Sequence, residues 1–308
     1  MKRFFTAVGV FASVVFGFIV LLSFIGISKL GSHTSAKLQK ESILALDLEG
    51  VIIDAKVILE NLRQYRKDPN IKGVLVKINS PGGVVGPSQE LYTELKRVRD
   101  EWQKPVVVSL NGVAASGAFY AAVAADKIVT NPGTMVGSIG VIMEFANLQG
   151  LYEWAKIQRF TITTGPYKDS GAEYRPMRVD EKELFQGLIN DVLSQFINHV
   201  AEGRKLDPAE VRKYADGRVF TGSFAVEHKF ADQLGSYDDA IKLIGEMTGL
   251  GQEPNLFVPP KKRPDIFELL GDAEARFSIT QQVRKTIHSS LVGVPLAVFP
   301  GALLGSQP

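Results

Sequence analysis

Ser116 is the side chain of this sequence best placed to act as a nucleophile. It lies in the run Asn-Gly-Val-Ala-Ala-Ser-Gly-Ala at residues 111–118, directly after the apolar run 105–110. The apolar run predicts a buried strand, and the small residues after it predict a tightly packed helix. A hydroxyl at such a junction lies beside a free backbone N–H and can attack a carbonyl group. On this segment alone, a helix cap or close packing explains the serine more simply.

A serine hydroxyl needs a base, and lysine or histidine could supply it. Lys168 follows a proline turn in Gly-Pro-Tyr-Lys-Asp-Ser-Gly at residues 165–171, although a lone loop lysine is usually solvated. Because lysine is almost wholly protonated at neutral pH, a lysine base has to be desolvated. A Ser-His-Asp triad is disfavoured because none of the four histidines lies in a glycine-rich or strand-end context: His33, His199, His228 and His288.

Two other glycine-rich segments could complete such a site. The turn Asn-Ser-Pro-Gly-Gly at residues 79–83 ends a predicted strand, where a Gly-Gly pair lets the backbone approach a substrate and aim an N–H at it. A plain Pro-Gly turn explains the same residues, and the spacing of a nucleotide-phosphate loop is absent. Residues 133–141 mix glycine and serine with apolar residues, which predicts a buried irregular segment in which Ser138 needs a polar partner.

Composition excludes several classes of function. The 308 residues are 45% hydrophobic and carry a net charge of only +2, so a globular chain is expected and no basic field favours nucleic acid. The absence of cysteine removes disulfides, thiolate metal sites and a cysteine nucleophile. The sequence has no His-Glu-x-x-His motif and no carboxylate cluster, and we therefore predict neither a metal nor a cofactor.

The N-terminus predicts a membrane anchor. Residues 4–28 carry no charge and are long enough, at about 1.5 Å per residue, to cross a bilayer. The run is longer than the apolar centre of a cleavable signal peptide and has no clear cleavage site after it. Lys2 and Arg3 precede it, which orients the N-terminus toward the cytoplasm and the remainder outside the inner membrane. We thus expect an anchor over residues 1–30 and a polar tether over residues 31–42.

The remainder alternates between strand and helix patterns. Strands are predicted at residues 43–48, 51–53, 73–78, 106–110, 127–130 and 160–164, and helices at residues 55–65 and 87–102. Repeated β-α-β units of this kind build a parallel sheet in an α/β fold. Asp180 and Glu183 form a capping signal for a long helix ending at Gly203. We place one domain at residues 43–250 and a Pro-rich linker and tail at residues 251–308, whose apolar end is too short for a confident second span.

Four of these motifs together resemble a known family. Residues 79–83, 115–117, 136–141 and 167–169 occur in the order and approximate spacing of the signal peptide peptidase A family of membrane-anchored Ser/Lys endopeptidases. The resemblance covers residues 43–249. It implies the ClpP/crotonase type of fold and a ring-shaped homo-oligomer whose active sites combine residues from neighbouring chains. The roles it implies are nucleophile for Ser116, general base for Lys168, a hydrogen bond to that lysine for Ser138, and oxyanion donors for Gly82, Gly83 and Gly117.

Three functions follow as hypotheses. The first is an extracytoplasmic, inner-membrane serine endopeptidase, on the periplasmic side, that degrades cleaved signal peptides and other apolar peptides. The second is a related membrane-bound Ser/Lys protease that cleaves a membrane-protein partner. The third is a crotonase-like acyl-CoA enzyme that uses backbone N–H donors without a covalent serine, and it is disfavoured because CoA is cytoplasmic.

Overall fold

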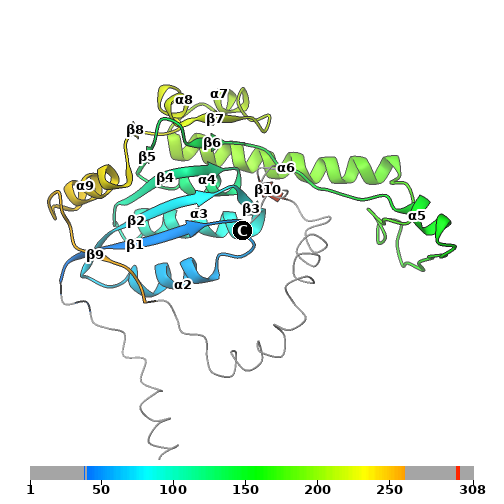
Figure 1. Ribbon diagram of the computed structural model, residues 1–308, viewed down its shortest axis with the longest axis horizontal. Helices are drawn as coiled ribbons and strands as arrows, with labels where there is room; N and C mark the ends of the chain where they lie inside the picture. The colour runs from blue at the N-terminus through cyan, green and yellow to red at the C-terminus, as the bar shows by residue number, and fades with distance from the viewer. Residues whose placement is uncertain (1–37, 39, 261–295, 299–308) are drawn as a thin grey trace, which may run out of the picture. The chain divides into compact units, whose positions relative to one another are not determined.

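The computed structural model describes residues 38, 40–260 and 296–298 (Figure 1). The predicted anchor at residues 1–30, like most of the tether, lies outside these ranges. Within the described ranges no helix has both the length and the apolar character to cross a bilayer.

The described part of the chain is built on one mostly parallel sheet. Its strands follow the order β7-β6-β4-β2-β1-β9, and β5 pairs with both β4 and β8. Every pairing is parallel except that between β6 and β7. These strands are β1 (Ser42–Glu49), β2 (Ile71–Ser80), β4 (Val106–Ala115), β5 (Lys127–Thr130), β6 (Met135–Gly137), β7 (Val219–Thr221), β8 (Gln233–Leu234) and β9 (Leu256–Phe257). The predicted α/β class with a mostly parallel sheet is confirmed.

Strand β4 pairs with two different strands along one of its edges. Its first half pairs with β5, where Leu110 lies opposite Thr130, and its second half pairs with β6, where Ala115 lies opposite Gly137. The last residue of β4 therefore sits next to the last residue of β6 at one edge of the sheet. Residues that follow these two strands are consequently neighbours in space.

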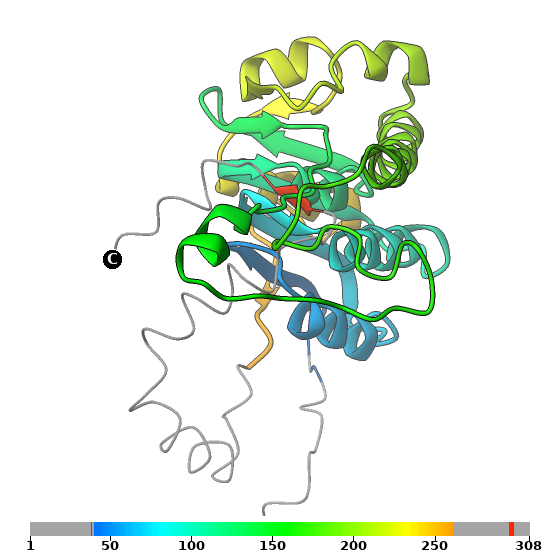
Figure 2. The same cartoon turned by 90° about the vertical axis from the view of Figure 1, so that its right-hand side faces the viewer.

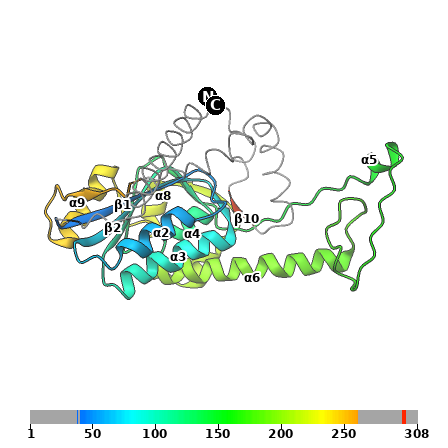
Figure 3. The ribbon, with the colours of Figure 1, turned by 90° about the horizontal axis from the view of Figure 1, so that it is seen from below.

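Helices cover both faces of the sheet. The helix α9 (Tyr237–Thr248) packs on one face through a fully buried cluster: Ile43, Leu75, Val107, Val129, Ala240 and Ile244. Figure 3 shows α2 (Lys56–Tyr65), α3 (Val85–Asp100) and α4 (Gly117–Ala122) on the other side. The residues of β2 alternate between the two layers, and Val74 and Leu75 are both fully buried. Burial on both faces explains the continuous apolar runs of these strands.

A second, two-stranded sheet lies beside the first. The short strand β3 (Gly82–Val84) pairs antiparallel with β10 (Leu296–Val298), with Ala297 opposite Gly83. Both β9 and β10 come from the segment predicted as linker and tail, so part of that segment joins the sheets. Their lengths of two and three residues are too short for an apolar period to be recognised.

Two expected strands differ in the structure. Residues 160–164 contain no strand, and of residues 51–53 only Ile52 forms an isolated bridge, to Gly83. Residues 160–164 alternate as a strand would, but Phe160 and Ile162 are 85% and 94% exposed. An alternating pattern forms a strand only where a neighbouring strand supplies hydrogen bonds, and no such neighbour reaches this part of the described chain.

The longest helix carries an extension away from the sheet. Helix α6 (Val179–Arg204) packs against the body with its C-terminal half, and its N-terminal half extends beyond the sheet (Figures 1 and 3). We call residues 141–178 the arm. It includes α5 (Gln149–Trp154) and forms the wide green loop that faces the viewer in Figure 2. The remaining short helices, α7 (Pro208–Arg212) and α8 (Gly222–Glu227), follow α6.

Candidate active site

Ser116 occupies a strained turn between strand β4 and helix α4. Its φ and ψ angles are 53° and −117°, and its side chain is almost completely buried. A residue with a Cβ adopts positive φ only when its surroundings enforce it, and such strain concentrates at functional sites. Here the Ser116 N–H donates to the Gly137 carbonyl at 2.7 Å, which continues the β4–β6 ladder by one residue. The sheet therefore imposes the turn that sets the direction of the hydroxyl.

The Ser116 hydroxyl has only a weak partner in the described residues. Its Oγ lies 3.5 Å from the Gly140 carbonyl oxygen, at the outer limit of a hydrogen bond. No histidine, lysine or carboxylate of the described chain forms a hydrogen bond with it. Among the described residues of one chain, no base contacts the candidate nucleophile.

Backbone N–H groups surround the turn. Gly117 is the first residue of α4, and an N–H in the first turn of a helix has no partner inside the helix. Strand β3, with Gly82 and Gly83, contacts α4. The Gly82 N–H already donates to Ser80 Oγ at 3.2 Å. Gly117 is therefore the most available of the three predicted oxyanion donors, while Gly83 lies opposite Ala297 of β10.

Gly83 is fixed by close packing. A Cβ built on Gly83 would lie 2.0 Å from the carbonyl oxygen of Ile52, a separation that real Cβ atoms do not show. That carbonyl accepts the Val84 N–H at 2.7 Å, and the Ile52 N–H donates to the Gly82 carbonyl at 2.9 Å. The strand-like residues near Ile52 thus hold the Gly-Gly turn in place.

Ser138 lies next to Ser116 at the same edge of the sheet. It follows β6 as Ser116 follows β4, and it too has a positive φ, of 49°. Its N–H donates to the Arg218 carbonyl at 2.8 Å, and its side chain is 4% exposed. The structure therefore brings together the two serines singled out in the sequence.

A cavity of about 260 Å³ opens beside the two serines. It lies between the segment after β6, one face of α6 and the turn before β7. Its walls mix aliphatic and polar side chains, and Gly140, which contacts Ser116 Oγ, is part of them. The lining residues are Ser138, Gly140, Val141, Ile142, Gln186, Ile189, Asn190, Leu193, Ala215, Asp216 and Gly217.

Lys168 lies elsewhere, in the arm. The loop that carries it is tied to the start of α6, because Arg178 Nη2 donates to the Pro166 carbonyl at 2.7 Å. Gln186 is the first residue of α6 that lines the cavity beside Ser138, and it lies eight residues after Arg178, a rise of about 12 Å along the helix. The Lys168 side chain is exposed. The described residues of one chain therefore provide neither a contact between Lys168 and Ser116 nor the desolvation expected of a lysine base.

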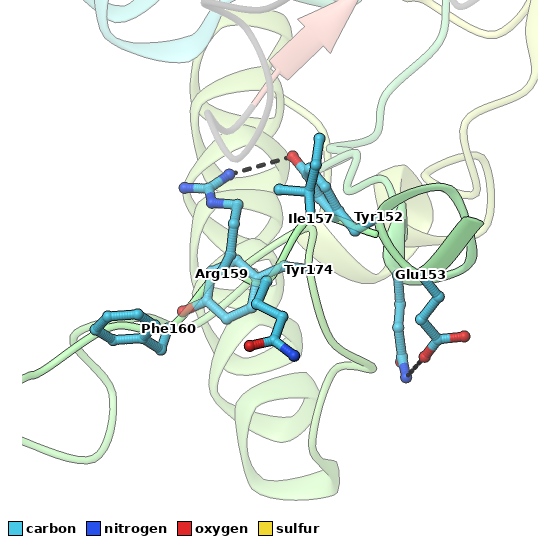
Figure 4. Close-up of a pocket in the computed structure, with 8 residues that line it drawn as sticks. Tyr152, Glu153, Ile157, Arg159, Phe160 and Tyr174 are labelled. Carbon is cyan, nitrogen blue, oxygen red and sulfur yellow. Dashed lines mark hydrogen bonds between the residues drawn. The ribbon is translucent and has the colours of Figure 1, made fainter. Parts of the chain in front are cut away.

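The arm has a cavity of its own, of about 340 Å³ (Figure 4). Arg159 crosses it, donating to the Tyr152 hydroxyl at 3.2 Å and pairing with Glu173. Two apolar side chains that line it, Ile157 and Phe160, are 52% and 85% exposed, and Trp154 of the neighbouring α5 is 82% exposed. Large exposed apolar groups in one segment are typical of an interaction surface.

The two described histidines have structural surroundings. His199 Nδ1 lies 2.6 Å from the Tyr120 hydroxyl, and its ring stacks on Tyr92 at 4.4 Å. Burial lowers the pKa of His199. His228 stacks on Phe224 at 3.8 Å, and His33 and His288 lie outside the described residues. In the described ranges, no group of three or more His, Asp or Glu side chains is arranged to hold a metal ion.

The predicted cap of the long helix was assigned to the wrong residue. The carboxylate that accepts the Arg178 N–H belongs to Glu181, at 2.9 Å, whereas Glu183 is exposed. Glu181 and its partner Arg175 were not singled out in the sequence. A buried charged pair has no periodicity of its own, although the glutamate three residues after Arg178 is a signal that could have found it.

Comparison with known proteins places this arrangement among peptidases. The model of peptidase family S49 matches residues 99–250. The chain is 37% identical to a putative protease of Synechocystis sp. over 213 residues, which covers 68% of this chain and 76% of the relative. It is 38% identical to a putative protease of Methanocaldococcus jannaschii, covering 64% and 63% of the two chains. It is 32% identical to a putative signal peptide peptidase SppA of Enterococcus faecium, covering 65% and 62%. The chain thus spans about three quarters of the first relative and under two thirds of the other two.

Proposed function

This chain belongs to peptidase family S49, the signal peptide peptidase A family, and we propose that it is a membrane-anchored, extracytoplasmic serine endopeptidase with a Ser116/Lys168 dyad. The observation that carries the proposal is the buried Ser116 in its strained turn. Next to it lie the N–H of Gly117 and the Gly-Gly strand β3. A nucleophile beside preorganised N–H donors is the arrangement that acyl transfer requires. The strand pairing and helix packing described above also agree with the ClpP/crotonase type of fold.

The proposed reaction has two stages, acylation of Ser116 and hydrolysis of the resulting ester. The Lys168 amine accepts the Ser116 proton while Oγ bonds to the scissile carbonyl carbon, and the resulting oxyanion accepts hydrogen bonds from Gly83 and Gly117. The C–N bond then breaks, the proton passes from Lys168 to the leaving amine, and water hydrolyses the acyl ester. Ser138 orients the lysine amine through its hydroxyl.

We propose that the lysine comes from a neighbouring chain. The side chain of Lys168 is exposed, and its loop is tied to α6 at Arg178, about 12 Å along the helix from the first residue lining the cavity beside Ser138; both observations support this arrangement. So do the exposed apolar residues of the arm, which a second copy would cover. Contact of this kind is heterologous, and a heterologous contact repeated with rotational closure gives a ring. Burial against the neighbour would also supply the desolvation that a lysine base needs.

Substrates are proposed to bind as extended strands along β3. A substrate strand would take the place of β10, which pairs antiparallel with that edge and whose Ala297 lies opposite Gly83. A bound strand would pass the oxyanion donors and place side chains toward the cavity lined by Val141, Ile142 and Leu193. Aliphatic walls favour apolar side chains, as cleaved signal peptides carry. The uncharged residues 4–28 support a location at the inner membrane, where such peptides accumulate.

A serine-directed fluorophosphonate probe tests the proposal on the full chain in membranes. The wild-type chain is expected to form a covalent adduct on Ser116, and Ser116→Ala and Lys168→Ala are expected to block both labelling and peptide hydrolysis. Losing a nucleophile costs several orders of magnitude in kcat. Peptidase activity of Ser116→Ala within about tenfold of wild type, about 1.4 kcal/mol of barrier, would remove Ser116 from the mechanism. A folded wild-type chain that does not label would favour a crotonase-like enzyme instead.

A further inference from the structure

The loop that carries Lys168 is held by a cluster of four charged side chains at the start of α6. We call Asp169, Arg175, Arg178 and Glu181 the arm clamp. Their contacts reach the chain on both sides of Lys168, although the lysine side chain itself is exposed. The backbone around Lys168 is thus held in place, while the lysine side chain forms no hydrogen bond or ion pair with the described residues.

Arg175 binds the residue immediately after Lys168. Its Nη2 lies 3.0 Å from Asp169 Oδ1 and donates to the Asp169 carbonyl at 3.1 Å, and its Nε donates to Oδ2 at 3.2 Å. The Tyr174 hydroxyl donates to the same carboxylate at 3.2 Å. One guanidinium therefore holds both the side chain and the backbone of Asp169. A lysine cannot reproduce this set of contacts, because only the guanidinium has a planar fork of donors.

Glu181 anchors Arg175 to the helix. Its side chain is completely buried and accepts from Arg175 Nη1 at 2.9 Å and Nη2 at 2.5 Å. The hydrogen bonds from Arg175 lower the pKa of Glu181 to about 2. Its Oε2 also accepts the Arg178 N–H, which fixes the first turn of α6. A fully buried carboxylate with these partners is a rigid point of attachment.

Arg178 completes the clamp on the other side of the lysine. Its Nη2 donates to the Pro166 carbonyl, two residues before Lys168, and its Nη1 lies 2.9 Å from Glu181 Oε1. The Lys168 N–H itself donates to the Gly165 carbonyl at 3.2 Å. The backbone from Pro166 to Asp169 is thus fixed relative to α6 at both ends.

We propose that Arg175, anchored by Glu181, is a positioning residue that sets where the Lys168 amine is presented to the Ser116 of a neighbouring chain. The inference rests on the proposed function. A base delivered from another chain has to arrive at a defined position, and a displacement of about 1 Å can cost about 100-fold in rate. Helix α6 lines the cavity beside Ser138, and the arm clamp fixes the lysine loop to the start of this helix. The loop therefore has a defined position relative to α6.

The test substitutes Arg175 in the full-length, membrane-bound oligomer. We expect Arg175→Gln to lower kcat and the rate of fluorophosphonate labelling by the same factor, about 10- to 100-fold, with KM within about threefold. The kcat and labelling rate of Arg175→Lys should lie between those of Arg175→Gln and wild type.

Arg204→Gln is the matched control. Arg204 forms a shielded ion pair with Asp232 at 2.8 Å near the other end of the same helix. Its loss should lower the melting temperature while kcat stays within about threefold of wild type. This control separates a general loss of stability from a loss of lysine positioning.

Near-normal kcat in Arg175→Gln, or a fall in kcat no larger than that caused by Arg204→Gln, would overturn the inference. If Arg175→Gln fails to assemble, the same criteria apply to Arg175→Lys and to Glu181→Gln, which keeps the shape of the anchor. The proposed function fails separately, if Ser116→Ala or Lys168→Ala is active. If Ser116→Ala and Lys168→Ala are inactive but Arg175→Gln is active, the positioning role of Arg175 is rejected and the proposed dyad stands.

Discussion

At the scale of single residues, the site depends on side chains placed in backbone conformations that few residues tolerate. Ser116 and Ser138 both have positive φ, and each follows a strand of the same parallel sheet. The segments around the two serines were recognisable in the sequence because glycine and serine interrupt apolar runs at strand ends. The backbone strain of Ser116 could not be predicted, because the hydrogen-bond ladder between β4 and β6 imposes it.

Ser138→Ala should weaken catalysis less than loss of either dyad residue. The change removes one hydroxyl from a nearly buried site and leaves the Ser138 N–H bond to Arg218 intact. Removing a hydrogen bond that orients the base costs about 1 to 3 kcal/mol, so kcat/KM should fall about 5- to 150-fold. Steady-state peptide hydrolysis measures this fall in kcat/KM. A loss of activity as complete as that of Ser116→Ala would show that Ser138 does more than orient the lysine.

Gly83→Ala should lower both stability and activity. Its Cβ would meet the Ile52 carbonyl at 2.0 Å, so β3 has to move away, at a cost of about 1 to 3 kcal/mol for overpacking. Gly86→Ala is the control, because a Cβ there meets nothing within 4 Å. Thermal unfolding and peptide hydrolysis compare the two variants. Equal melting temperatures and activities would show that β3 does not need a glycine.

At the scale of elements, the sheet and its covering helices were predictable and the arm was not. The apolar runs of β1, β2 and β4 indicate buried parallel strands because both faces are covered, as Val74 and Leu75 of β2 show. The arm has exposed Trp154, Phe160 and Ile162 in place of a buried face. Apolar spacing therefore predicted a strand at residues 160–164 where the chain makes none. The clamp of Arg175 on Glu181 is a tertiary contact with no sequence period.

Acid should weaken the packing of α6 on α3 and α4 through His199. Burial lowers the pKa of this histidine, which contacts Tyr92 and Tyr120 and has Glu202 and Lys96 nearby. The unfolded chain then binds the proton more readily, so the contribution of His199 to stability falls as the pH drops below about 6.5. The melting temperature of His199→Gln should depend less on pH between 8 and 5 than that of wild type. Parallel pH profiles would contradict this.

At the scale of the whole molecule, the proposed dyad combines residues of more than one chain. Ser116, Gly117, Gly83 and Ser138 are gathered at one edge of the sheet, whereas Lys168 is presented on the arm. The sequence contained all of these residues, but it could not show which of them share a chain in the site. That property depends on the length and direction of α6 and not on any local pattern.

Mixing two inactive chains tests this central claim most directly. Ser116→Ala retains an intact arm, and Lys168→Ala retains an intact serine turn. If the dyad forms between neighbours, co-expression in equal amounts should restore about one quarter of wild-type activity, since each site then needs one particular pairing in a ring. Peptide hydrolysis by the co-purified oligomer gives the answer. Mixed oligomers that form but stay as inactive as either variant alone would contradict a dyad shared between chains.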